Sequence, residues 1–292
     1  PAHELIASAY SSTGRPSKCV IQLFRAFLFA SREKLNIKAL RKRLLCRPPL
    51  RALCGFSSKE EVPALGTFYH LIDRFVPINE KKQLKAPIGA RPKKKDIGSD
   101  QKLPDKRSTA RTTRLAEQIM DDKISLSRTP ERLMQLIFSK VAVLPSVKAG
   151  LISENPVVSG DGTCLKTGAS SYGVKTCDCR KHGIFRCKCL RNFSDPLANV
   201  GWDSHEKHWY YGYTAFFMTT YSKKYKKDLP LTVRLVDAKR HDSLTTMLAL
   251  VDLRETTPEI SVETFLGDSA MDCGAMYSLL DHFHIQAVID LN

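Results

Sequence analysis

The sequence has no uninterrupted apolar run long enough to cross a membrane, and no secretory signal pattern at its start. A spanning helix needs about 18 consecutive apolar residues, whereas Arg25 interrupts the apolar stretch from Cys19 to Ala30. The nine cysteines are an odd number, which together with the missing signal predicts reduced thiols rather than a disulfide framework. We therefore expect a cytoplasmic protein that has no membrane partner.

Acidic residues are scarce relative to basic ones. The 292 residues contain 30 Asp and Glu against 46 Lys and Arg, a formal net charge of +16. Such an excess favours a polyanionic partner, and nucleic acid is a better candidate than an anionic membrane surface. The hydrophobic content of 42% is ordinary for a chain that buries a core. We expect a globular protein that binds nucleic acid.

The N-terminal region, residues 1–80, has apolar residues at helical spacing. Between residues 18 and 45 they recur among basic residues as in two short amphipathic helices, and residues 65–75 predict a further helix. This pattern predicts a small all-helical domain. Such a domain can supply a helix to a DNA groove, or it can be a packing module without DNA contact, and the sequence leaves both interpretations open.

The next segment, residues 81–114, is rich in lysine and arginine and is broken by prolines and glycines. It has too few large apolar side chains to fold by itself, so we interpret it as a linker or an arm. Its basic side chains could neutralise DNA phosphates, or the segment could be a solvated linker. The candidate DNA-binding residues are Lys93, Lys94, Lys95, Lys106, Arg107 and Arg111.

A helical connection is expected over residues 115–155, and the pattern then changes to alternating strands and helices. Three successive strands precede an alternation of helix and strand, which predicts an α/β domain, residues 156–292, with a mixed sheet and flanking helices. The expected strands are 156–159, 208–221, 231–237, 262–267 and 285–291, and the expected helices are 243–254 and 271–283.

Two acidic residues follow expected buried strands. Asp161 follows Val-Val-Ser-Gly, and Asp268 follows Phe-Leu-Gly. A carboxylate in such a place needs a partner, and paired carboxylates on neighbouring strands suit Mg²⁺, which prefers oxygen ligands. The alternative is that Asp161 begins an Asp-Gly turn and Asp268 caps a helix, as we interpret Asp242 to do.

A set of motifs in a fixed order resembles the catalytic region of DDE transposases encoded by bacterial and archaeal insertion sequences. The segment that begins at Leu65, Leu-Gly-Thr-Phe-Tyr-His-Leu-Ile-Asp-Arg-Phe, resembles the end of the helical N-terminal domain of the same proteins. The motifs are Asp161-Gly-Thr, Ser194-Asp-Pro-Leu-Ala-Asn, Gly201-Trp-Asp-Ser, Tyr210-Tyr-Gly-Tyr-Thr, Ala238-Lys-Arg-His-Asp-Ser, Gly267-Asp-Ser-Ala-Met-Asp and Val288-Ile-Asp-Leu-Asn.

The resemblance implies a ribonuclease-H-like fold in which Asp161 and Asp268 are the first two catalytic acids and ligands of Mg²⁺ or Mn²⁺. It also implies strand cleavage at transposon ends, attack of the 3′-hydroxyl on target double-stranded DNA, and a homo-oligomer on the DNA. The family's third acid, a Glu on a helix after the last expected strand, has no counterpart here because the sequence ends first, and the nearby Asp290 falls within an expected strand. We therefore expect a truncated transposase, with a nuclease on the same fold or an inactive DNA-binding remnant as alternatives.

Four cysteines are clustered in an insertion, residues 175–192. Cys177 and Cys179 form one Cys-x-Cys pair, and Cys187 and Cys189 form another. Four thiolates brought together by a loop satisfy tetrahedral Zn²⁺, so we predict a structural zinc site there. The alternatives are four free thiols in a surface loop and a zinc ribbon that itself binds nucleic acid.

Overall fold

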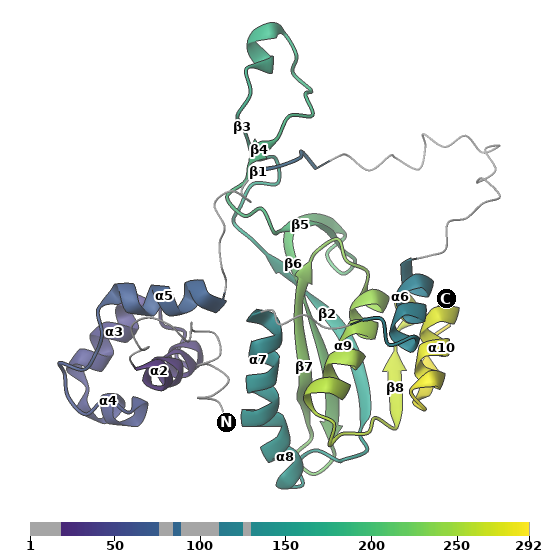
Figure 1. Ribbon diagram of the computed structural model, residues 1–292, viewed down its shortest axis with the longest axis horizontal. Coiled ribbons are helices and arrows are strands. Elements are labelled where there is room, and N and C mark those ends of the chain that lie inside the picture. The colour runs from purple at the N-terminus through teal and green to yellow at the C-terminus, as the bar shows by residue number, and fades with distance from the viewer. Residues whose placement is uncertain (1–18, 76–83, 89–110, 125–129, 292) are drawn as a thin grey trace. The chain divides into compact units, whose positions relative to one another are not determined.

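The computed structural model describes residues 19–75, 84–88, 111–124 and 130–291. Five of the predicted DNA-binding residues lie outside these ranges: Lys93, Lys94, Lys95, Lys106 and Arg107. The chain divides into two units (Figure 1). The first comprises Pro1–Ile78 and Ser127–Pro145, and the second comprises Asn79–Leu126 and Ser146–Asn292.

The first unit is helical. Its core buries Leu23, Leu40, Phe68 and Ile137, so the later helix α7 shares one core with the earlier helices. Asn36 caps α3, because its side chain accepts a hydrogen bond from the Ala39 backbone N–H at 2.8 Å. The helices are α2 (Val20–Arg32), α3 (Ile37–Cys46), α4 (Pro48–Cys54), α5 (Leu65–Phe75) and α7 (Pro130–Phe138), and α7 continues as η3 (Ser139–Val143) and α8 (Leu144–Lys148).

The second unit is built on a six-stranded mixed sheet. The long strand β6 pairs on one edge with β2 and on the other with β5 and then β7, all antiparallel. On the far side of β2 follow β8 and β9, both parallel to it. The strands are β2 (Val157–Lys166), β5 (Asn199–Asp203), β6 (His208–Ser222), β7 (Lys227–Asp237), β8 (Thr264–Gly267) and β9 (Gln286–Ile289). The predicted α/β fold with a mixed sheet and helices is confirmed.

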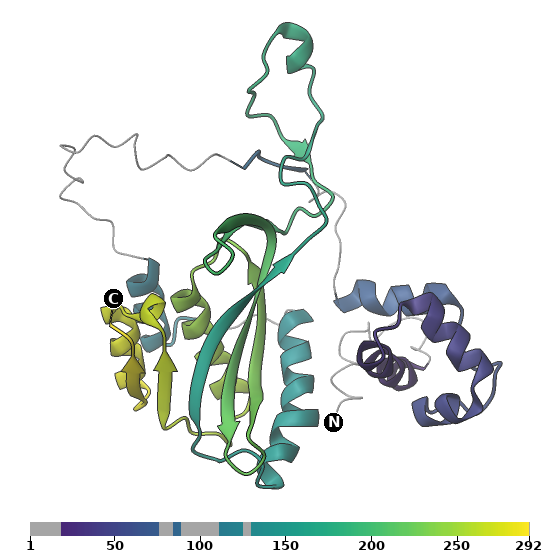
Figure 2. The same cartoon turned by 180° about the vertical axis from the view of Figure 1, so that it is seen from behind.

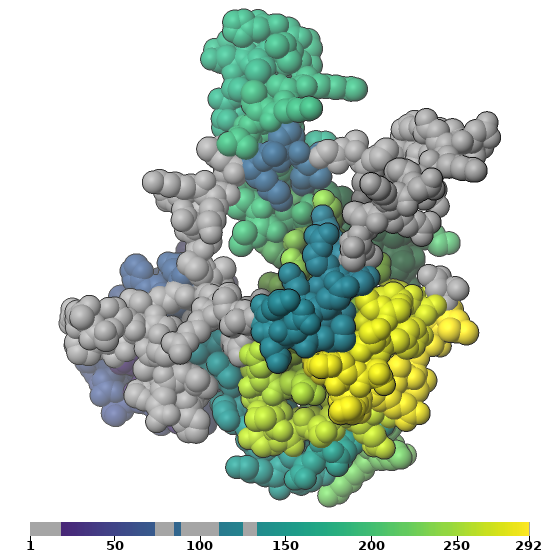
Figure 3. Space-filling model, turned by 45° about the vertical axis from the view of Figure 1, so that its right-hand side comes forward, coloured from purple at the N-terminus to yellow at the C-terminus, as the bar shows by residue number. Residues whose placement is uncertain are grey.

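Three helices of this unit lie over one face of the sheet: α6 (Arg111–Met120), α9 (Asp242–Thr256) and α10 (Gly274–His282). Helix α9 lies in front of the strands in Figure 1 and behind them in Figure 2. Helix α6 packs against α9 and α10, as the space-filling view shows (Figure 3). Side chains of β2 alternate accordingly: Val158 is fully buried, whereas Val157 is 44% exposed.

Strand β2 corrects one expectation about Asp161. The sequence predicts a strand over residues 156–159 that ends in an Asp-Gly turn, but β2 continues to Lys166. Asp161 pairs with Phe217 of β6, and the ladder extends as far as Gly212. The predicted turn is wrong because this long pairing with β6 outweighs the local turn preference of Asp-Gly.

A small three-stranded sheet supports a hairpin at one end of the second unit. Its order is β1 (Leu84–Lys85), β4 (Arg191–Asn192) and β3 (Val174–Lys175). Phe193, Ala198 and Tyr211 form a buried cluster at its base. The Lys85 ammonium donates to the Ala198 carbonyl at 2.8 Å. Two parts of the predicted basic linker, β1 and the start of α6, are therefore regular elements of this unit.

None of the helices in the described ranges has the length and apolar character that crossing a membrane requires.

Candidate active site

Asp161 lies in β2, and Asp268 directly follows the neighbouring parallel strand β8, at matching positions. Ser159 and Leu266 are the last residues that pair between these two strands, and each aspartate comes two positions later in its segment. Both aspartates are exposed. The sheet therefore brings the two predicted acids to one place, where a dissolved substrate can reach them.

Both carboxylates accept hydrogen bonds from nearby backbone groups. The Oδ1 atom of Asp161 accepts from the Gly162 N–H at 2.6 Å. The Oδ1 atom of Asp268 accepts from the Ala270 N–H at 3.2 Å and caps the short helix η5 (Ser269–Met271). The capping role foreseen as an alternative for Asp268 is thus present, and it leaves the second carboxylate oxygen available for a ligand.

A third carboxylate, Asp242, lies close to these two. Its Oδ1 atom is 3.1 Å from the position that a Cβ atom on Gly162 would take, so the glycine makes room for it. Burial raises the pKa of Asp242, the charges of Asp161 and Asp268 raise it further, and His241 opposes them. The structure therefore places a third carboxylate beside Asp161 and Asp268. From the sequence we interpreted this residue only as a helix cap.

That interpretation of Asp242 is wrong. The N-cap of α9 is His241, Asp242 is the first helical residue, and no side-chain bond caps this end. The His241 ring bonds instead to the Ser243 hydroxyl at 2.9 Å. Asp242 still suits this end of the helix, because a negative charge is favourable near a helix N-terminus. Asp242 belongs to the motif Ala-Lys-Arg-His-Asp-Ser, so the sequence pointed to this segment. Only the sheet brings Asp242 close to Asp161 and Asp268.

The three aspartates offer the ligand atoms of a divalent-cation site, but they do not enclose one. Their donors are oxygens, as Mg²⁺ and Mn²⁺ prefer. No Lys or Arg in the described ranges forms an ion pair with any of them. However, the ligand atoms of the three aspartates do not all lie within 4.8 Å of one another. In two other clusters of the described ranges, the ligand atoms do lie that close.

One of these two clusters comprises Asp203, Glu206 and His208, at the turn between β5 and β6. The ammonium group of Lys166 lies 2.7 Å from a Glu206 oxygen and 3.6 Å from an Asp203 oxygen. Backbone N–H groups and then Lys166 lower the pKa of Asp203. A lysine thus already occupies the place of a cation, and we interpret this cluster as an ion-pair network of the turn.

A basic groove of about 650 Å³ lies beside the start of α9. Arg111 of α6 lines it, and so do Lys239, Arg240 and His241 from the segment before α9. Arg111 is the only predicted DNA-binding residue within the described ranges. Lys239 and Arg240 were not predicted as DNA-binding residues, because two basic residues in a loop indicate nothing until a helix brings Arg111 next to them. Such a groove suits a phosphate backbone.

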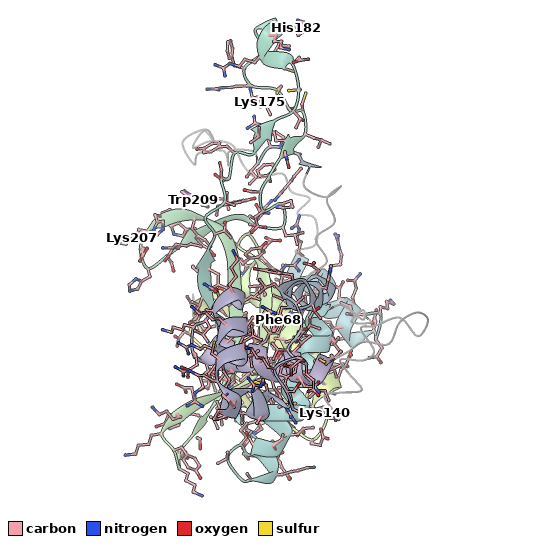
Figure 4. The ribbon with its side chains drawn as sticks, turned by 90° about the vertical axis from the view of Figure 1, so that its left-hand side faces the viewer. Phe68, Lys140, Lys175, His182, Lys207 and Trp209 are labelled. Atoms are coloured by element: carbon pink, nitrogen blue, oxygen red, sulfur yellow. The ribbon has the colours of Figure 1, made fainter. Side chains whose placement is uncertain are left out.

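The second cluster comprises the four predicted zinc ligands, which the hairpin between β3 and β4 brings together. The Sγ atoms of Cys177 and Cys187 are 3.5 Å apart, and those of Cys179 and Cys189 are 3.6 Å apart. A hydrogen bond from the Cys179 N–H lowers the pKa of Cys177 to about 7, whereas the neighbouring sulfurs raise the pKa of Cys179 to about 12. None of the nine cysteines of the chain forms a disulfide bond. In Figure 4, His182 marks the tip of this hairpin and Lys175 lies nearer its base.

The N-terminal part of the chain matches a known protein family. Residues 1–74 match the family model described as Transposase domain (DUF772). No curated protein and no solved structure matches the chain. The match covers 74 of 292 residues and ends before all three aspartates. It supports a transposase, which is what the motifs of the other part of the chain resemble.

Proposed function

We propose that this protein is a DDE-type transposase that cleaves DNA at the ends of an insertion sequence and joins them to target DNA. The observation that carries the proposal is the matching position of Asp161, in β2, and Asp268, directly after the neighbouring parallel strand β8. The transposase-domain match at residues 1–74 supports it independently, because that region contains neither aspartate.

The sheet is consistent with the ribonuclease-H-like fold that the motifs imply. From one edge to the other the strands run β7, β6, β2, β8 and β9, the short β5 pairs with the same edge of β6 as β7, and β6 alone is antiparallel to the rest. The three antiparallel strands come first in the chain, and the two parallel ones follow by way of α9 and α10. We infer a ribonuclease-H-like domain whose catalytic acids project from the centre of the sheet.

Asp161 and Asp268 would hold Mg²⁺ or Mn²⁺, and Asp242 lies close enough to add charge to the site. A bound pair of such ions activates the attacking oxygen and stabilises the leaving one in phosphoryl transfer. The chain itself positions the DNA. Arg111, Lys239 and Arg240 line a groove beside the start of α9, where they can neutralise backbone phosphates. We further infer that the active form is a homo-oligomer on double-stranded DNA.

The competing function is DNA binding without cleavage. It is favoured by one observation: the three aspartates do not gather their oxygens within 4.8 Å, as the cysteines gather their sulfurs. A nuclease that cuts without joining is a further alternative on the same scaffold. These functions differ in whether the chain cuts DNA and in whether it joins the cut end to another molecule.

The test uses a supercoiled plasmid and an oligonucleotide with a free 3′-hydroxyl, in Mg²⁺ and in Mn²⁺. The proposal expects nicking and joining by the wild-type chain, and loss of both in Asp161→Asn and in Asp268→Asn. The control is Asp281→Asn, on an exposed side of α10. Nicking without joining would indicate a nuclease. Salt-sensitive binding without nicking, unchanged in both variants, would indicate a DNA-binding protein.

A further inference from the structure

The hairpin between β3 and β4 has no apolar core of its own. Its large apolar side chains are exposed: Val174 is 71% exposed, Phe185 66%, Ile184 53% and Leu190 50%. It projects beyond the sheet, and its only regular structure apart from the two short strands is η4 (Cys179–His182) (Figures 1 and 3). So many exposed apolar groups cannot stabilise a loop by burial, so another interaction must hold this one together.

Four thiols bridge the two arms of the hairpin. Cys177 and Cys179 belong to the first arm, Cys187 and Cys189 to the second, and all four sulfurs lie within 4.8 Å of one another. A tetrahedral zinc site with Zn–S bonds of about 2.3 Å has sulfurs about 3.8 Å apart. The closest contacts here, 3.5 and 3.6 Å, are near that value and far from the disulfide bond length of about 2.0 Å.

The hairpin is also strongly basic. Its one acidic residue, Asp178, is already paired with Lys181 at 2.8 Å. Arg180, Arg186 and Lys188 are exposed and close to the cysteines in the chain. A complex of Zn²⁺ with four thiolates has a net charge of about −2, and the hairpin stays positive even when this charge is included. Its basic residues are Lys175, Arg180, Lys181, Arg186, Lys188 and Arg191.

We propose that the four cysteines bind one structural Zn²⁺ and that the hairpin it closes contacts the phosphate backbone of DNA. Zinc fixes both arms, because each arm supplies two ligands, and it keeps the exposed arginines and lysine in one place. A preformed basic projection loses less conformational freedom on binding than a flexible loop does. The DNA contact rests on the proposed function, whereas the zinc site does not.

The zinc site is tested by the metal content of the full-length protein. We expect about one Zn²⁺ per chain in the wild type and in Cys46→Ser, which changes an exposed cysteine of α3. Cys177→Ser and Cys187→Ser should each lose the metal, and the thermal unfolding of the large sheet should take place at the same temperature as in the wild type. Co²⁺ in its place should give the absorption of a tetrahedral thiolate complex. A wild-type protein that takes up no Zn²⁺, or variants that retain it, would overturn the site.

The DNA contact is tested by the salt dependence of binding to a duplex oligonucleotide. The triple variant Arg180→Ala, Arg186→Ala and Lys188→Ala should bind more weakly, and the slope of log K against log salt should fall by about 0.9 for each phosphate that the variant no longer neutralises. The matched control removes three exposed lysines at the turn between β6 and β7: Lys223→Ala, Lys224→Ala and Lys227→Ala. Equal weakening in both variants would mean that binding follows net charge, and the proposed role of the hairpin in DNA binding would be wrong.

Neither measurement requires cleavage. Zinc content and the difference between the two triple variants can therefore succeed in a protein that does not cut DNA, and they can fail in one that does. The outcome for the hairpin is thus distinguishable from the outcome for Asp161 and Asp268.

Discussion

Asp242 and Gly162 are in close contact between α9 and β2, with the carboxylate Oδ1 atom 3.1 Å from the position of a Cβ atom on the glycine. Burial and the neighbouring Asp161 and Asp268 raise the pKa of Asp242. The folded protein therefore holds this proton more tightly than the unfolded chain, so stability falls as the pH rises from the ordinary carboxyl pKa to the raised one.

Asp242→Asn should accordingly raise the melting temperature at pH 7 in the absence of divalent ions. The difference from the wild type should disappear near pH 3, where the native carboxyl is protonated as well. Thermal melts between pH 3 and 7 measure this, with Asp281→Asn as a control for the loss of an exposed carboxylate. Equal melting temperatures of wild type and variant at pH 7 would contradict it.

Divalent ions should stabilise the wild-type protein through Asp161 and Asp268. Mg²⁺ or Mn²⁺ bound by Asp161 and Asp268 stabilises the folded state by mass action, by about 2.7 kcal/mol at one hundred times the dissociation constant. The wild-type melting temperature should therefore rise with Mg²⁺ at constant ionic strength, and that of Asp161→Asn should not. If both rise equally, the ions bind elsewhere.

The ion pair between Arg234 of β7 and Asp252 of α9 is almost completely buried, with side chains 12% and 7% exposed. Asp252→Ala would remove one of the two buried charges of this pair, and we expect a loss of about 3–5 kcal/mol in the free energy of unfolding. The control is Asp121→Ala, which removes the partner of Lys123 in an exposed pair and should change little. Urea denaturation compares the two, and similar losses would count against a special role for the buried pair.

Gly212 lies where β5, β6 and β2 meet, and a Cβ atom on it would be 2.0 Å from the Leu165 backbone carbonyl oxygen. Backbone cannot move aside as a side chain can, so Gly212→Ala should cost about 1–3 kcal/mol. Gly168→Ala is the matched control, because nothing lies within 4 Å of its Cβ position. The comparison is between the denaturation midpoints of the two variants. An unchanged midpoint for Gly212→Ala would mean that the strands shift without loss of stability.

Local patterns predicted α9, α10 and five of the six strands of the large sheet, because aromatic and β-branched residues mark β6 and apolar spacing marks α10. They did not predict β5 or the short strands β1, β3 and β4. The errors lie where residues distant in the sequence determine the local structure. Asp161-Gly is a turn signal by itself, but pairing with Phe217 makes it part of a strand. Asp242 is an ordinary capping candidate in its own helix, and only the sheet brings it to Asp161 and Asp268.

The cysteine cluster shows the same limit in a milder form. The two Cys-x-Cys pairs predicted which thiols would meet, because each pair lies on one arm of a short hairpin. The distances between sulfurs depend on η4 and on the pairing of β3 with β4, which no spacing rule provides.

The shared core of the helical unit has a consequence for its synthesis. Ile137 of α7 is 2% exposed and belongs to the same core as Leu23, which is made far earlier in the chain. During synthesis, helices α2–α5 are therefore made before the side chain that completes their core. Residues of the other unit, including β1 and α6, are synthesised in between. A nascent chain arrested before residue 127 should thus remain sensitive to protease over residues 19–75, and one extended past residue 145 should not.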